Sequence, residues 1–153
     1  MRTAARFCLP LVLLLLGSAR AHAFELELGG GAKVDVAPYG IENVTILGMG
    51  ASWVDQRENA QVGLIAAISA GPSKVDYELS ACLRIWPAPN ALAIFGGVGI
   101  VDDSSIDPSL VPLAICGLRF GTGALALVSS AEVHVKRGDT DTMFWVALAW
   151  MVR

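Results

Sequence analysis

The chain is poor in charge, and after residue 23 it contains no long apolar run. Asp, Glu, Lys and Arg make up 16% of its 153 residues, against about 25% in an ordinary soluble domain. Hydrophobic residues nevertheless make up 54%. No stretch within residues 24–153 approaches the ~20 consecutive apolar residues of a membrane-spanning helix. The apolar residues are therefore numerous but dispersed, which argues against a bundle of membrane-spanning helices.

The longest apolar run opens the chain, in MRTAARFCLPLVLLLLGSARAHA. Two arginines precede apolar residues that continue to Leu16, and Ala21-His22-Ala23 supplies the small residues of a cleavage site, which is the pattern of a secretory signal. A helical anchor is the alternative, but the run is shorter than a span of ~20 residues and Pro10 interrupts it. We predict Sec-type export, cleavage near Ala23, and a single domain over residues 24–153.

Positive charge and histidine are scarce in this predicted domain. It keeps fourteen acidic and eight basic residues, because three of the eleven basic residues lie in the signal. The resulting net charge of −6 disfavours a nucleic-acid partner. The acidic cluster of Asp102, Asp103 and Asp107 lacks EF-hand spacing and is predicted to be a solvated loop. We expect no metal site and no cofactor.

Polar and apolar residues alternate along much of the domain. In KVDYELSACLRIWP (74–87), apolar residues from Val75 to Ile85 alternate with more polar ones from Asp76 to Arg84. This is the period of a β-strand whose two faces meet different surroundings. Clusters of Gly, Pro, Asn and Asp separate such segments and predict turns. The predicted strands cover residues 24–36, 44–54, 61–70, 74–87, 91–101, 111–120, 124–136 and 142–152.

These strands predict an all-β fold, an eight-stranded antiparallel up-and-down transmembrane β-barrel. Most have about the nine to eleven residues that a tilted strand needs to cross a membrane, with lipid outside and a filled lumen inside. An even strand number places both termini on one side, which would be the periplasm. Residues 61–70, 91–101 and 111–120 are apolar or small on both faces, so the pattern alone does not choose their lumen-facing side.

The pattern resembles the small eight-stranded outer-membrane barrels of Gram-negative bacteria, such as the OmpA transmembrane domain, over the whole of residues 24–153. The resemblance implies an outer-membrane location, contact with outer-membrane lipid and lipopolysaccharide, and insertion by the barrel-insertion machinery. It identifies no protein partner. Members of the family usually end in an aromatic residue that this machinery reads, whereas the ending AWMVR places Trp150 before three further residues.

The aromatic residues are predicted to form girdles at the two membrane interfaces, because most of them fall near predicted strand ends. Phe95 is the exception and is placed near mid-depth. Core aromatics are the alternative interpretation. The predicted girdles comprise Phe24, Trp53, Trp86, Phe120 and Trp150 at the periplasmic rim, with Tyr39, Tyr77, Phe144 and Trp145 at the outer rim.

The charged residues of the predicted strands share the faces that we assign to the lumen. Opposite charges should pair there, because an uncompensated charge in a confined lumen is costly. We therefore predict a structural salt-bridge network. Its members would be Glu25, Glu27, Lys33, Asp35, Asp76, Glu78, Arg84, Arg119, Glu132 and Lys136.

The two cysteines of the domain, Cys82 and Cys116, lie in an exported chain that permits a disulfide. Cys82 shares the face of Arg84, whereas Cys116 lies opposite Arg119 if that arginine points inward. Strand parity therefore argues against a bridge.

Three functions are weighed. A non-enzymatic structural or interaction role leads, because eight strands leave no wide channel. A lipid A deacylase is the enzymatic alternative, since Ser130, Glu132 and His134 have the residue types of a hydrolase site. However, residues two apart lie ~6.6 Å apart along a strand, and the deacylase His-x-Ser arrangement is absent. A soluble β-barrel that binds a small apolar ligand is the third, but its exterior should be polar.

Overall fold

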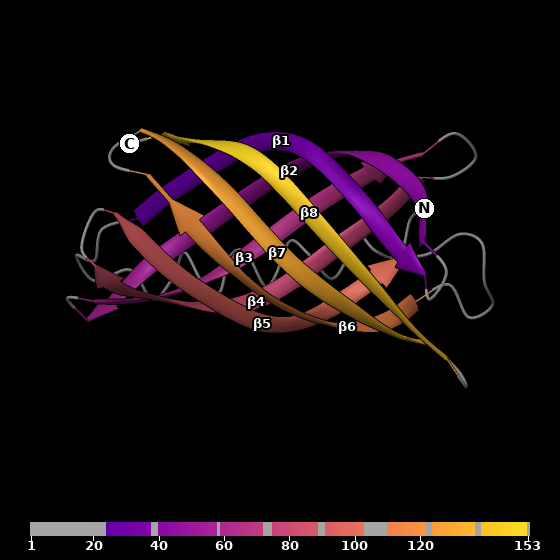
Figure 1. The fold of residues 1–153 in the computed structure, drawn as a ribbon. Coiled ribbons are helices and arrows are strands. Elements are labelled where there is room, and N and C mark those ends of the chain that lie inside the picture. Colours follow the sequence, from indigo (N-terminus) through magenta and orange to yellow (C-terminus); the bar gives the residue numbers. More distant parts are fainter. Residues whose placement is uncertain are drawn as a thin grey trace.

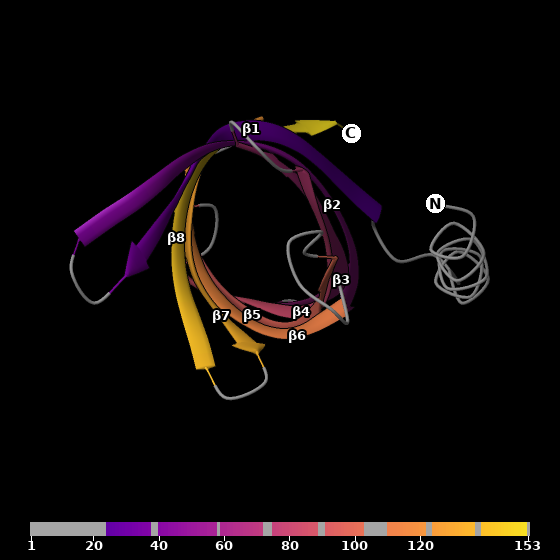
Figure 2. The same ribbon diagram turned by 90° about the vertical axis from the view of Figure 1, so that its right-hand side faces the viewer.

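The computed structural model describes residues 24–37, 40–57, 59–71, 75–88, 91–102, 110–121, 124–136 and 139–152. They form eight strands that close into one barrel (Figures 1 and 2). The strands are β1 Phe24–Ala37, β2 Gly40–Arg57, β3 Ala60–Ala70, β4 Val75–Ala88, β5 Leu92–Asp102, β6 Leu110–Phe120, β7 Leu125–Lys136 and β8 Asp139–Val152. Within this part of the chain, no helix has the length and apolar character to cross a membrane.

Every strand pairs antiparallel with its neighbours in sequence, and β8 closes the barrel against β1. The closing seam runs from the pair Leu26 and Val152 to the pair Asp35 and Met143. Because closure pairs both edges of the sheet, no strand is left as a free edge along the body of the barrel. The predicted eight-stranded antiparallel up-and-down barrel is confirmed.

Two hairpins extend past the closed part of the barrel at the same end. β2 pairs with β1 from residue 40 onward but with β3 only from Ile46, and β8 pairs with β7 from Asp139 but with β1 only from Met143. Figure 2 shows both hairpins leaving the ring of strands. The strands β2 and β8 are therefore longer than the predicted 44–54 and 142–152. The turn-forming residues at these positions predict loops, but cross-strand pairing overrides their local preference.

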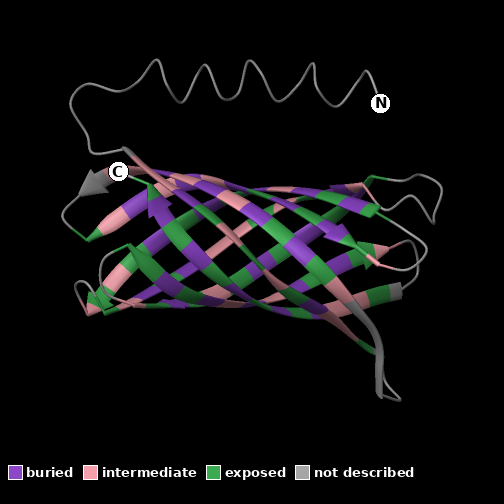
Figure 3. Ribbon diagram, turned by 90° about the horizontal axis from the view of Figure 1, so that it is seen from above, coloured by how far each residue is buried: buried purple, intermediate pink, exposed green. Residues whose placement is uncertain are grey.

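Burial alternates along the strands, as the bands of buried and exposed residues in Figure 3 show. The outward side carries large apolar side chains, including Ile46, Val98 and Leu148, which are 75%, 68% and 57% exposed. Along β4 the outward apolar residues run from Val75 to Ile85. At ~3.3 Å per residue and a tilt of about 40°, this run spans about 25 Å. That height matches the apolar band of a transmembrane barrel.

The register also decides which residues face the lumen in the strands whose two faces are alike in polarity. In β3, β5 and β6 the odd-numbered residues face the lumen, as the burial of Ile65, Phe95 and Ile115 shows. Inward glycines then give room to large neighbours. A Cβ on Gly63 would lie 2.7 Å from Cε3 of Trp53, and one on Gly117 would lie 2.5 Å from Cζ of Phe95. Small residues on one strand thus accommodate the aromatic rings of the next strand.

Candidate functional site in the barrel lumen

The lumen contains two groups of hydrogen-bonded polar side chains. The terminal layer lies near the strand ends that include the start of β1 and the end of β8, and the distal layer lies toward the projecting hairpins. The terminal layer comprises Glu25, Glu27, Trp53, Gln61, Arg84, Trp86 and Arg119. The distal layer comprises Lys33, Glu78, Glu132, His134 and Trp145.

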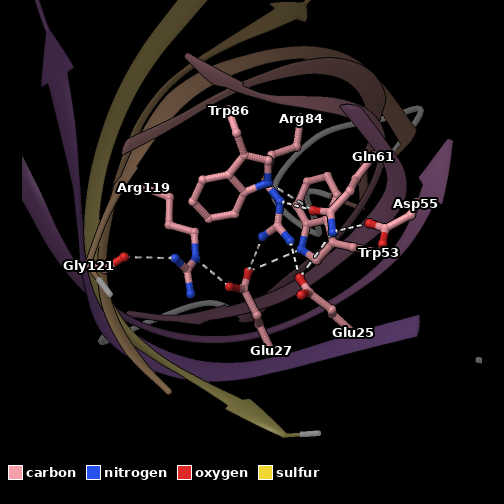
Figure 4. Close-up of polar contacts among 9 residues, drawn as sticks. All are labelled: Glu25, Glu27, Trp53, Asp55, Gln61, Arg84, Trp86, Arg119 and Gly121. Carbon is pink, nitrogen blue, oxygen red and sulfur yellow. Dashed lines mark hydrogen bonds and ion pairs between the residues drawn. The ribbon is translucent and has the colours of Figure 1, made fainter. Parts of the chain in front are cut away.

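Glu27 is the centre of the terminal layer (Figure 4). Its carboxylate accepts hydrogen bonds from Nε1 of Trp53 at 3.1 Å, from Nη1 of Arg84 at 3.0 Å and from Nε of Arg119 at 2.5 Å. Arg84 also donates from Nη2 to Glu25 at 2.7 Å. Two carboxylates and two guanidiniums therefore balance one another, as burial of charge requires.

Two tryptophan rings lie close to the guanidinium of Arg84. Its Cζ lies 4.2 Å from the ring centroid of Trp53 and 5.1 Å from that of Trp86, while Cζ of Arg119 lies 5.2 Å from the Trp86 ring. Cation–π contacts of this kind strengthen when the cation is withdrawn from water. Gln61 completes the layer, because it accepts from Nε of Arg84 at 2.6 Å and donates to Asp55 at 2.5 Å.

Glu132 is the centre of the distal layer. It accepts from Nζ of Lys33 at 2.6 Å and from Nε1 of Trp145 at 2.5 Å, and Nε2 of His134 lies 3.4 Å from its Oε2. Lys33 also pairs with Glu78. Both layers therefore combine a central glutamate with a cation and an indole N–H.

An apolar cluster of buried residues connects the two layers. It includes Trp53 of the terminal layer, Trp145 of the distal layer, and Met49, Ile65 and Phe95. The rings of Trp53 and Phe95 meet edge to face, with centroids 6.4 Å apart, a favourable aromatic geometry. The cavity beside Glu27 and Arg84 has a volume of about 10 Å³. This is about one water probe, so this cavity is too small for an organic ligand.

The structure divides the residues that we predicted as one lumenal network into separate groups. Glu25, Glu27, Arg84 and Arg119 meet in the terminal layer, and Lys33, Glu78 and Glu132 meet in the distal layer. Lys136 pairs instead with Asp141. Asp76 is buried on β4, and Asp35 is half-buried on β1.

Sequence reasoning missed Gln61, which belongs to the terminal layer, Asp55, which accepts a hydrogen bond from Gln61, and Asp141, which pairs with Lys136 on the projecting hairpin. Gln61 opens a strand whose remaining residues are apolar or small, so its inward orientation depends on the register with β4. Asp55 and Asp141 fall in segments that the sequence predicts as turns. Their inward orientation could have been found from the two-residue period only if the strands had been extended to include them.

The girdle prediction is wrong for three tryptophans. Trp53 and Trp145 are 2% and 1% exposed and point into the lumen, and Trp86 donates from Nε1 to Gln61 at 3.3 Å. The physical reason is that buried carboxylates and amides need donors, and an indole N–H supplies one together with a large apolar surface.

Four other girdle candidates do face outward: Tyr77, Phe120, Phe144 and Trp150. Their position at a membrane interface stays a prediction. The side chain of Phe24, and Tyr39 as a whole, lie outside the described residues, as do Asp103 and Asp107 of the acidic cluster.

The structure does not assemble the hydrolase site that Ser130, Glu132 and His134 would form. All three are buried in the lumen, at 4%, 1% and 2% exposure. Glu132 and His134 are in contact, but Oγ of Ser130 has no hydrogen-bond partner among the described residues. A nucleophile must lie within reach of its base, and here that contact is absent.

The cysteines lie on opposite sides of the barrel wall. Cys82 is buried on the lumenal side and Cys116 is exposed on the outer side, and both thiols are free. The two side chains therefore face opposite ways, as the strand parity predicts.

No protein-family model and no curated protein sequence matches the chain. Solved structures do resemble it. Neisserial surface protein A is 8% identical with a TM-score of 0.60, and the similarity covers 87% of this chain and 99% of that one. Ail, the attachment invasion locus protein of Yersinia pestis, is 12% identical with a TM-score of 0.59, and the similarity covers 84% of this chain and 97% of that one. The N-terminal β-barrel domain of Pseudomonas aeruginosa OprF is 11% identical with a TM-score of 0.57, and the similarity covers 86% of this chain and 99% of that one. Together with the closed antiparallel barrel, these similarities show that the chain has the fold of the small eight-stranded outer-membrane β-barrels.

Proposed function

We propose that the chain is a non-enzymatic integral outer-membrane barrel, plugged by its own side chains, with a structural or interaction role at the cell envelope. The observation that carries this proposal is the reversed polarity of the barrel. Charged side chains meet in the interior, while Ile46, Val98 and Leu148 are among the large apolar side chains that cover the exterior. Lipid accommodates such an exterior, whereas water does not.

The same observation opposes a soluble ligand-binding barrel. A soluble barrel places its apolar side chains inside and its polar ones outside. Here Arg84, Glu132 and His134 are among the most buried side chains. An exposed apolar surface far larger than a few hundred Å² would aggregate in water.

An interaction role finds support at the projecting end of the barrel. The hairpins β1–β2 and β7–β8 extend beyond the closed body (Figure 1). Two proteins of similar fold are a surface protein and an attachment invasion locus protein. We propose that this end faces outward from the cell and presents the hairpins to a partner.

An enzymatic role is not favoured, because Ser130, Glu132 and His134 are buried in the lumen and the Ser130 hydroxyl makes no hydrogen bond to either of the other two residues. Replacing Ser130 with Ala and His134 with Gln in an expressing cell should leave the acylation of lipid A unchanged. A change in lipid A that the wild-type chain produces and S130A abolishes would overturn this part of the proposal.

Membrane fractionation joined to a folded-versus-boiled gel tests the proposal as a whole. We expect extraction from the membrane only by detergent, and faster migration of the unboiled than of the boiled sample, because a closed barrel resists detergent until it is heated. Release of the protein by osmotic shock, in a form that migrates alike before and after boiling, would contradict it.

A further inference from the structure

Three potential metal ligands converge in the distal layer. Glu78 on β4 and Glu132 and His134 on β7 are all buried, and one ligand atom of each lies within 4.8 Å of the others. Two carboxylate oxygens and one imidazole nitrogen are a donor set that Zn²⁺ and Co²⁺ accept.

A cation already lies among these ligands. Nζ of Lys33, which reaches in from β1, pairs with Oε1 of Glu78 and with Oε2 of Glu132, the latter at 2.6 Å. The side chain of Lys33 is only 4% exposed. An ammonium in this position supplies the positive charge that a metal ion would bring, and it would repel a second cation at the same place.

His134 is the ligand that Lys33 does not use. Its Nε2 makes only the 3.4 Å contact with Glu132, and its Nδ1, although buried, has no hydrogen-bond partner among the described residues. In the terminal layer the two glutamates are matched by Arg84 and Arg119, and the buried nitrogen without a hydrogen-bond partner, Nη2 of Arg119, belongs to a guanidinium, which offers a metal ion no lone pair. The distal layer therefore keeps an unused nitrogen donor beside carboxylates that share one cation.

We infer that Glu78, Glu132 and His134 form a cation site whose resident cation is the Lys33 ammonium, and that a divalent transition metal binds there once Lys33 is removed. The wild-type barrel then needs no metal ion to hold its distal layer together. Its stability is independent of chelators and of added Zn²⁺ or Co²⁺. Replacing Lys33 with Met, which is one atom shorter than lysine and carries no charge, exposes the site.

Co²⁺ titration of the refolded barrel in detergent, followed by visible absorption, tests the inference. We expect K33M to bind one equivalent of Co²⁺ at least tenfold more tightly than the wild type, and Co²⁺ to raise the temperature at which folded K33M converts to the slow-migrating band. The matched control is K33M/H134Q, which has the same charge on its carboxylates but lacks the nitrogen ligand. It should lose the binding.

Two results would overturn the inference. Wild-type protein that binds one equivalent of Co²⁺ as tightly as K33M would show that Lys33 does not occupy the site. Folded K33M that binds no Co²⁺, or binds it equally well with H134Q, would show that the three residues are not a metal site. If K33M does not fold without metal, it is refolded with and without Co²⁺, and the intensity of the folded band on the gel is compared. A folded band that does not increase with Co²⁺ would contradict the inference.

Discussion

At the scale of single residues, the lumen is organised by buried glutamates that accept several donors at once. Glu27 binds two guanidiniums and an indole N–H, and Glu132 binds an ammonium and an indole N–H. Removing one member of a buried ionic group leaves the others uncompensated, which costs more than the intact group contributes. Sensitivity to substitution should therefore follow burial and the number of partners.

Glu27→Gln tests this expectation. It should lower the free energy of unfolding by about 3 kcal/mol, because Arg84 and Arg119 lose a shared counter-charge in a buried position. The matched control is Glu25→Gln on the same strand. The Glu25 side chain is 17% exposed against 3% for Glu27, so its loss should cost about 1 kcal/mol. Urea unfolding of the barrel from lipid vesicles measures both, and equal losses would refute the ranking.

At the scale of strands, a large lumenal side chain on one strand lies beside a small residue on the adjacent strand. Gly63 on β3 lies beside Trp53 on β2, and its missing Cβ leaves the space that the indole ring fills. The outward Gly48 on β2 is different, because a Cβ there would meet nothing within 4 Å. Glycine is thus required at the first position and not at the second.

Substitution of these two glycines by alanine should separate the two situations. Gly63→Ala drives a Cβ against the backbone oxygen of Ser52 as well as the Trp53 ring, and should cost about 1–3 kcal/mol through overpacking. Gly48→Ala adds a methyl group to the outer surface and should change the free energy of unfolding by less than about 0.5 kcal/mol. The midpoint of heat conversion on a gel ranks the two variants. A greater loss for G48A would contradict the assigned register.

The sequence predicts strands well where polarity alternates and poorly where both faces are apolar. β4 is of the first kind, and its lumenal and outer faces follow from the alternation of Asp76 to Arg84 with Val75 to Ile85. β2 is of the second kind. There the bulky Met49 and Trp53 face the lumen while Gly48 and Gly50 face outward, so hydrophobicity alone favours the wrong face. Register with β1 and β3 decides the orientation.

Tertiary pairing likewise decides which polar residues meet. The sequence shows that Lys33, Glu78 and Glu132 could share a lumen, but they come from β1, β4 and β7, which are not adjacent strands. Their contact depends on closure and on the strand stagger of the barrel. The two separate ionic layers therefore could not be read from the two-residue period.

At the scale of the whole molecule, the barrel wall separates a polar interior from an apolar exterior. A charge placed on the exterior should therefore be costly in proportion to its depth in the membrane. Val98, in the middle of β5, is 68% exposed and pairs with the central residues Ala81 and Ala114. Leu110, at the end of β6, is 56% exposed.

Val98→Arg should lower the stability of the vesicle-inserted barrel by about 2–4 kcal/mol, whereas Leu110→Arg, nearer the rim, should cost about 0–1 kcal/mol. Unfolding of both variants from vesicles by urea measures the difference. A soluble barrel would tolerate both arginines equally, and that outcome would argue against burial of this surface in lipid.

The most direct test of the account compares two tryptophans on one strand. On β8, Trp145 is 1% exposed and faces the lumen, whereas Trp150 is 58% exposed and faces outward. Single-tryptophan variants are inserted into vesicles whose acyl chains carry bromine, a contact quencher of indole fluorescence. We predict strong quenching of Trp150 and little quenching of Trp145. Quenching of Trp145 with Trp150 unaffected, or no quenching of either, would contradict the claim that the apolar exterior contacts acyl chains.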